Sequence, residues 1–251
     1  MSGRIAALYR HPVKGFTPER LAGADLEAGC FFPCDRIYAV EDGPSGFDPA
    51  APAFVSKTRF AVLAKIAEVA KARTTFDEAS GMLHAEAEGA EPFAARLADP
   101  AGRDAFAAWL SGLLGEAATG PLKVVHAEGH RFTDAPNGFV SIINLESVRD
   151  LQRRIGQPVD PLRFRANLYV EGWPALTELE AEGREVALGG ARARVTKPIV
   201  RCAATMVNPT TAERDVDVPA GLFETYGHLL CGVYVEVIAS GRVDEGSPAR
   251  L

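Results

Sequence analysis

The chain has 251 residues, of which 47% are hydrophobic and 24% charged, and this balance excludes a disordered, collagen-like or membrane-spanning protein. Its formal net charge of -6 gives no general attraction to polyanions, so nucleic acid is not an expected partner. The four cysteines are too few for a disulfide framework and no secretory signal opens the sequence, so we expect a cytoplasmic protein without membrane contact.

Short strands and turns dominate the first half of the sequence. Apolar and polar residues alternate over residues 5–9, which predicts a strand that ends at His11 and Pro12. Further predicted elements are a strand at residues 36–40, a helix over 61–72, and a hairpin from 74–76 and 82–84. Residues 85–100 are rich in Ala, Glu, Gly and Pro without a strand period, and they are the expected domain boundary.

Helices lie in the middle of the sequence, and strands dominate its last third. Apolar residues recur at helical spacing over residues 106–114, and a second helix is predicted between Asn144 and Gly156. Strands are predicted at residues 122–126, 168–170, 191–196 and 233–237. Short strands with glycine-rich turns favour a β-barrel or sandwich over a doubly wound sheet, and the usual nucleotide-binding loops are absent from the sequence.

Residues 195–211 carry the most informative chemistry, because they contain Cys202. Pro198 is expected to stop the preceding strand and to leave Cys202 on the loop that follows. Lys197 and Arg201 lie close by, and neighbouring cations favour the thiolate, which is both a nucleophile and a soft metal ligand. The sequence fits equally well a small packed cysteine beside two solvated cations.

The other cysteines and the histidines give weaker signals. We interpret Cys30, Cys34 and Cys231 as packing residues. No set of Cys and His residues has zinc-finger spacing. A nucleophile pair formed by Cys202 and His228 stays open, although no third orienting group is identified for it.

Several polar side chains stand where a predicted strand begins or ends: Lys14, Arg36, Arg165 and Asn167. Taken singly, each of the three cations among them fits an ordinary surface charge. If they converge, they can bind a fixed anion such as a phosphate, for which the planar arginine fork is well suited.

Several ordered motifs resemble the MOSC domain, which is named for the C-terminus of the molybdenum cofactor sulfurase. The run K-P-x-x-R-C-x-x-T-x-V-N-P-x-T over residues 197–211 is similar to the signature of that domain. The run F-R-A-N-L over 164–168 resembles its Arg-Pro-Asn strand entry. Residues 232–234 and 246–248 resemble its closing strand and final turn.

The N-terminal part extends this resemblance over nearly the whole chain. Residues 9–14 and 35–36 are similar to the small β-barrel domain that precedes MOSC in the amidoxime-reducing molybdenum enzymes and their bacterial relatives. The resemblance implies a β-rich α+β fold. A small N-terminal β-barrel domain over residues 1–90 would pack on a MOSC β-barrel over residues 100–251, with a few flanking helices.

The resemblance also implies a molybdenum–pyranopterin cofactor, molybdopterin, in the cleft between the two domains. In that family, the cysteine at the position of Cys202 ligates molybdenum, and the lysine and arginine at the positions of Lys14 and Arg36 hold the phosphate of the cofactor. Residues that match Arg165 and Asn167 bind the pterin side. The implied cofactor-binding set is completed by Arg201, Thr205 and, in a loop expected over the cofactor at residues 133–136, Thr133 and Asp134.

The implied activity is the reduction of N-hydroxylated small molecules such as amidoximes and hydroxylamines, with Cys202 as the catalytic metal ligand. The chain has too few cysteines for an Fe–S cluster of its own, so a separate electron-transfer protein would supply the electrons. Pyridoxal phosphate binding is a further association at the level of the family. Two other functions stay open: a sulfur carrier with a persulfide on Cys202, and a non-catalytic module that binds a small anion.

Four positions depart from the usual pattern of the family. Ala166 stands where proline is usual, Asn208 where aspartate is usual, and Ala212 where glycine is usual. Gly15 stands where the mitochondrial enzymes have a serine that touches the cofactor. None of these changes removes the metal ligand or a phosphate cation, so they affect the expected substrate more than the expected cofactor.

Overall fold

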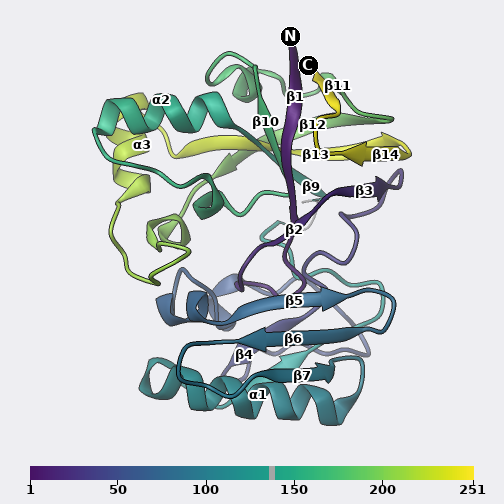
Figure 1. Cartoon of the computed structure of the whole chain (residues 1–251), viewed down its shortest axis with the longest axis vertical. Helices are drawn as coiled ribbons and strands as arrows, with labels where there is room; N and C mark the ends of the chain where they lie inside the picture. Colours follow the sequence, from purple (N-terminus) through teal and green to yellow (C-terminus); the bar gives the residue numbers. More distant parts are fainter. Residues whose placement is uncertain (136–138) are drawn as a thin grey trace.

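A computed structural model describes residues 1–135 and 139–251 of the chain. The C-terminal half, together with the first strand of the chain, forms a closed barrel of seven strands. The strand order around the barrel is β10 (Leu168–Glu171), β9 (Val140–Asn144), β13 (Leu230–Ala239), β12 (Ala191–Val200), β11 (Glu185–Leu188), β15 (Pro248–Arg250) and β1 (Ser2–Arg10). The barrel closes because β1 also pairs with β10 (Figure 1). The expected β-rich α+β fold with a barrel is therefore confirmed.

The barrel interior follows the two-residue repeat of its strands. Along β12, Ala191, Ala193 and Val195 are buried, whereas Arg192 and Arg194 between them are exposed. The buried side chains of all seven strands meet in one hydrophobic core, together with Phe32 and Trp173. Further elements around the barrel are β2 (Glu19–Leu21), β3 (Gly23–Leu26), β14 (Gly241–Asp244), η4 (Pro161–Phe164), η5 (Thr177–Glu180) and η6 (Ala203–Met206).

Two α-helices lie on one side of the barrel (Figure 1). The first, α2 (Leu145–Ile155), begins at Asn144, whose side chain accepts a hydrogen bond from the Glu146 N–H, and ends at Gly156 in the left-handed conformation. The second, α3 (Val218–Tyr226), packs against α2. The predicted bounds of α2 are confirmed, because both of its caps are local features of the sequence.

The N-terminal half forms a separate core below the barrel (Figure 1). Its sheets are β5 (Arg73–Asp77), β6 (Met82–Glu86) and β7 (Phe93–Arg96), and β4 (Ala39–Asp42) with β8 (Leu122–Val125). The helices are α1 (Pro100–Leu114), η1 (Lys57–Arg59), η2 (Ala67–Lys71) and η3 (Gly115–Ala117). The predicted hairpin and the helix before Gly115 are confirmed. None of the helices within residues 1–135 and 139–251 combines the length and the apolar character needed to cross a bilayer.

Four local predictions are wrong. The expected helix over residues 61–72 is reduced to η2, because the Ala61 N–H donates to the Val40 carbonyl and ties this end of the segment to β4. The strand before Cys202 does not stop at Pro198 but runs to Val200, since Pro198 lies at an irregularity of the β12–β13 pairing where a missing N–H is tolerated. The third error is the expected lack of a strand over residues 85–100, where the structure has the edge strand β7. The fourth is Cys30, an expected packing residue that is exposed.

The two halves are interlocked along the chain. The strand β1 belongs to the barrel although it opens the sequence, and Val207 and Ala212 from the second half pack into the N-terminal core. The helix α1 and the strand β8 pack on the N-terminal side, and a domain boundary at residues 90–100 stays a prediction. The junction between the halves is therefore built from segments that are distant in the sequence.

The buried face of α1 gives a direct test of the N-terminal core. Leu110 is completely buried, whereas Leu113 on the next turn is only partly buried. We expect Leu110→Ala to lower the free energy of unfolding by about 2 to 5 kcal/mol, because it leaves a cavity, and Leu113→Ala to lower it by less than half as much. Urea denaturation of the two variants measures this difference. Equal losses would contradict the orientation of the helix.

Candidate functional site

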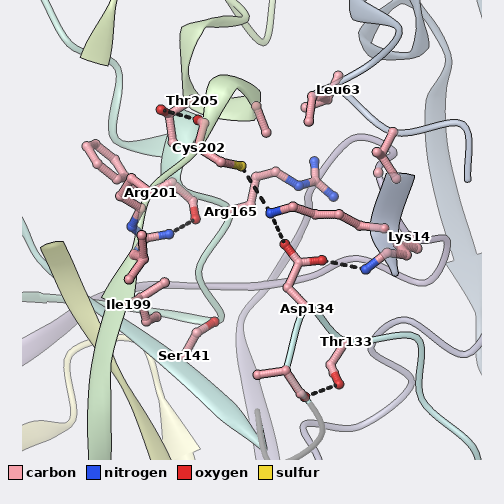
Figure 2. Close-up of a pocket in the computed structure, with 18 of the residues that line it drawn as sticks. Lys14, Leu63, Thr133, Asp134, Ser141, Arg165, Ile199, Arg201, Cys202 and Thr205 are labelled. Atoms are coloured by element: carbon pink, nitrogen blue, oxygen red, sulfur yellow. Dashed lines mark hydrogen bonds and ion pairs between the residues drawn. The ribbon is translucent and has the colours of Figure 1, made fainter. Parts of the chain in front are cut away.

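A cavity of about 390 Å³ lies between the two halves and is lined by all nine site residues predicted from the sequence. Figure 2 labels most of them. These residues are Lys14, Arg36, Thr133, Asp134, Arg165, Asn167, Arg201, Cys202 and Thr205. Lys14 and Arg36 come from the N-terminal half, and Cys202 follows the barrel strand β12. The structure shows that these residues lie around one cavity. The ligand group that each of them binds stays a prediction.

The thiol of Cys202 opens into this cavity. Cys202 precedes the turn η6, is only partly buried, and has its Sγ 3.1 Å from the Nζ of Lys57. Burial opposes the charge of Lys57, but Asp134 and Cys202 outweigh it and raise the pKa of Lys57 above its usual value. A stable positive charge therefore stands beside the sulfur.

The turn that carries Cys202 is held by three side chains. Thr205 donates its hydroxyl to the Cys202 carbonyl at 2.9 Å. Arg163, which is buried, donates to the Met206 carbonyl at 2.8 Å, and Arg214 donates to the Ala203 carbonyl at 2.8 Å. The other end of the Arg214 guanidinium donates to the carbonyl of Leu63 at 2.7 Å, so this turn is also tied to the N-terminal half.

Two lysines share one carboxylate on the opposite wall. Lys14 is only 3% exposed, and its Nζ donates to the Phe132 carbonyl at 2.9 Å and to Oδ1 of Asp134. Nζ of Lys57 lies 3.2 Å from Oδ2 of Asp134. Burial lowers the pKa of Lys14, although Asp134 offsets part of this effect. Burial raises the pKa of Asp134, but the two ammonium groups outweigh it and hold that pKa below its usual range.

Two arginines of the cavity have unusual backbone conformations. Arg36 and Arg165 have φ angles of 51° and 54°, in the left-handed region that residues other than glycine seldom adopt. The Arg36 guanidinium donates to the Arg165 carbonyl at 3.0 Å, and Arg165 donates to the Phe16 carbonyl at 2.6 Å. Burial, with the charge of Arg36, lowers the pKa of Arg165 to about 10. Backbone strain of this kind is typical of functional sites.

Three buried nitrogen atoms on residues that line the cavity lack partners. Among the residues that the structure describes, Nε of Arg163 and the Nη2 atoms of Arg165 and Arg201 have no hydrogen-bond acceptor. The other nitrogens of Arg201 donate to the carbonyls of Cys231 and Phe164, and Arg201 as a whole is only 8% exposed. Buried donors without acceptors are costly, so they favour a ligand that brings acceptor atoms.

Asn167 and Thr133 line the cavity but use their side chains locally. The Asn167 Oδ1 accepts from the N–H and hydroxyl of Ser141 at 3.0 and 2.9 Å, and its Nδ2 donates to the Tyr9 carbonyl. The Thr133 hydroxyl donates to the Ala135 carbonyl. Pro136, the last residue of the loop expected over the cofactor, lies outside the described residues.

Sequence reasoning missed several side chains of the cavity, among them Lys57, Arg163 and Tyr234. Lys57 stands in the short 3-10 helix η1, which has no strand or motif signal in the sequence, and only the tertiary fold brings it to Cys202. Arg163 precedes Arg165 by two residues, and this spacing gave no reason to separate it from a surface charge. His228 does not line the cavity: its Nδ1 accepts from the Leu230 N–H, so it is not a partner of Cys202.

Three of the four departures from the family pattern have local structural explanations. Gly15 has φ +90°, and an added Cβ would lie 2.9 Å from the Ala61 oxygen, so a serine does not fit there without movement. The Ala166 N–H donates to the Tyr169 hydroxyl at 3.2 Å, a bond that proline cannot make. Asn208 donates to Oδ2 of Asp215 at 2.7 Å, where an aspartate would repel that carboxylate.

Comparisons with known proteins cover both halves of the chain. The family model of the MOSC N-terminal beta barrel domain matches residues 2–117, and that of the MOSC domain matches residues 129–250. No curated protein matches the chain.

The solved structures that are similar to this chain share little sequence with it. The YUAD protein from Bacillus subtilis is 15% identical over 99% of this chain and 94% of its own, with a TM-score of 0.48. YiiM from Escherichia coli is 25% identical over 47% of this chain and 56% of its own, with a TM-score of 0.34. YiiM from Geobacillus stearothermophilus is 23% identical over 46% and 54%, with a TM-score of 0.36.

His11 behind the cavity makes stability depend on pH. Its ring is completely buried beside Asp35, and burial, with the charges of Arg165 and Arg36, lowers its pKa to about 3. Below pH 6.5 the unfolded chain takes up a proton that the folded protein does not. We therefore expect the free energy of unfolding to fall by about 1 kcal/mol from this group between pH 7 and pH 5.5.

Urea denaturation at the two pH values measures this loss. His11→Phe should remove this part of the pH dependence, whereas His84→Gln, at an exposed position, should leave it unchanged. The same slope in wild type and His11→Phe would show that another group is responsible.

Proposed function

The chain belongs to the MOSC family, with a MOSC N-terminal beta barrel domain followed by a MOSC domain, and we propose that it is a molybdenum-cofactor-dependent reductase of N-hydroxylated small molecules. Some members of the family are associated with the molybdenum cofactor. The observation that carries the proposal is the position of Cys202, whose thiol faces a cavity lined by cations from both halves of the chain.

The side chains of the cavity fit an anionic cofactor. Its lining includes seven basic residues: Lys14, Lys57, Lys197, Arg36, Arg163, Arg165 and Arg201. Asp134 is the single carboxylate that lines it among the described residues. The unpartnered Nη2 atoms of Arg165 and Arg201 add two free donors. A cofactor with a phosphate and several acceptor atoms would match this set in charge and in hydrogen bonding.

Each part of the cofactor has a group of this chain that suits it. Lys14 and Arg36 would hold its phosphate, Arg165 and Asn167 would face the pterin, and the Cys202 thiolate would bind the metal. The positive charge of Lys57 beside Sγ favours that thiolate. When bound, the cofactor supplies the two-electron reduction that, with two protons, converts an N-hydroxyl group into N–H and water.

The protein supplies positioning and exclusion of water. Val62 and Leu63 from one half and Ile199 from the other give the cavity an apolar wall, which suits the carbon skeleton of a small substrate. The turn after Cys202 is fixed by Thr205 and Arg163, so the sulfur has a defined position. The electrons would come from a separate electron-transfer protein, and an anaerobic assay with a reduced dye and a panel of amidoximes and hydroxylamines tests the reaction.

Metal analysis tests the function assigned to Cys202. In protein from a host that makes the cofactor, we expect about one equivalent of molybdenum per chain and almost none in Cys202→Ala, because the soft ligand is lost. Cys34→Ala, which changes a thiol outside the cavity, is the matched control. Equal molybdenum in wild type and Cys202→Ala would reject the ligand function.

The same variants separate the two alternative functions. A sulfur carrier would show one labile extra sulfur on Cys202 by mass spectrometry and no metal. A non-catalytic anion-binding module would keep its ligand in Cys202→Ala. Lys57 is 3.1 Å from Sγ and would also stabilise a persulfide anion, so mass spectrometry belongs beside the metal analysis.

Retention of the cofactor tests the phosphate cations. Lys14→Ala and Arg36→Ala should each weaken retention by roughly 1.5 to 3 kcal/mol, because each removes a charge-assisted contact at a buried site. Lys123→Ala, on an exposed position of β8, should change nothing. The cofactor released during dialysis measures the effect, and unchanged retention in both cavity variants would contradict the model.

A further inference from the structure

The pair formed by Lys14 and Lys57 already holds an anion supplied by the chain itself. One oxygen of the Asp134 carboxylate contacts Nζ of Lys14, and the other lies 3.2 Å from Nζ of Lys57 (Figure 2). The two lysines come from separate segments, one after β1 and one in η1. A carboxylate that gives one oxygen to each ammonium group occupies the position that two oxygens of a phosphate would take.

Lys14 is the fixed part of this contact, and the carboxylate is the replaceable part. Lys14 is 3% exposed and is also held by the Phe132 carbonyl at 2.9 Å. A cation so deeply buried requires an anionic partner. Asp134 is 45% exposed and lies between β8 and β9, outside any helix or strand. Moving Asp134 into solvent would therefore cost less than moving Lys14.

A second observation points to a ligand in the same cavity. The Nη2 atom of Arg165 is buried and has no acceptor within residues 1–135 and 139–251. Asp134 does not serve as its acceptor, because this carboxylate is paired with the two lysines. The Asp134 carboxylate has two oxygens, and both are already engaged by the lysines. A tetrahedral oxoanion has four oxygens and could satisfy the lysine pair together with further donors.

We propose that Lys14 and Lys57 form an oxoanion-binding site and that Asp134 is its resident, exchangeable ligand. An incoming phosphate group takes the place of the carboxylate between the two ammonium groups, and no covalent bond changes. This deepens the proposed function and rests on it for the identity of the natural ligand, the phosphate of the cofactor. The site itself needs neither the metal nor Cys202, so inorganic phosphate is a sufficient probe.

Calorimetric titration of the full-length, cofactor-free protein with inorganic phosphate at fixed ionic strength tests the site. Asp134→Asn removes the competing carboxylate and keeps its size, so we expect it to bind phosphate about tenfold more tightly than wild type. Lys57→Met should bind about tenfold more weakly, because it removes one of the two ammonium groups. The double variant, Asp134→Asn with Lys57→Met, should bind phosphate more weakly than Asp134→Asn alone.

Two matched variants control for the change of net charge. Asp215→Asn also removes a carboxylate paired with a basic residue of the cavity, Arg163, but it does not contact the lysine pair. Lys197→Met removes a cavity lysine that lies over the Tyr234 ring and not against Asp134. Each should change the phosphate affinity by less than about threefold, as expected for an indirect charge effect.

Three results would overturn the proposal. Asp134→Asn could bind phosphate no more tightly than wild type, or Asp215→Asn could gain as much. Lys57→Met could also lose no more affinity than Lys197→Met. The titration uses cofactor-free protein and inorganic phosphate, whereas the metal chemistry is tested by the molybdenum content of Cys202→Ala, so a failure of this site is distinguishable from a failure of the proposed function. Thermal unfolding of each variant shows whether a loss of binding reflects a loss of fold.

Discussion

Burial of positive charge at the junction of the two halves is the constraint on which the site depends. Lys14, Arg163 and Arg201 are almost completely withdrawn from solvent, and burial of a charge is unfavourable unless a partner compensates it. The chain supplies part of that compensation through Asp134, Asp215 and a set of backbone carbonyls. The compensation is incomplete at Arg165 and Arg201, which is why a bound anion would complete the junction.

The same contacts join the two halves mechanically. Arg165 from the barrel side donates to the Phe16 carbonyl, and Arg214 connects the turn after Cys202 to the Leu63 carbonyl. The left-handed backbone of Arg36 and Arg165 aims both guanidinium groups at this junction. A site assembled in this way keeps its geometry only when both halves are folded and packed, so binding and folding are coupled.

The two halves contribute different chemical groups to the cavity. The barrel presents the soft sulfur atom at the end of a long, well-paired strand, whereas the N-terminal half presents Lys14 and Lys57. Lys57 connects the two, since its ammonium group contacts both the sulfur and the only carboxylate among the described residues of the cavity wall. Changes at Lys57 would therefore be felt by the anion and by the thiol together.

The sequence by itself determined the elements with local signals, the β-rich class and the family. The caps of α2 are examples, because Asn144 and Gly156 act on their own backbone. It also identified nine residues of the cavity from motifs, but not Lys57 or Arg163. Only the tertiary structure decided the length of η2 and the passage of β12 through Pro198, since contacts with distant strands set both. The contact of Lys57 with Cys202 likewise depends on chain packing, for which no local pattern exists.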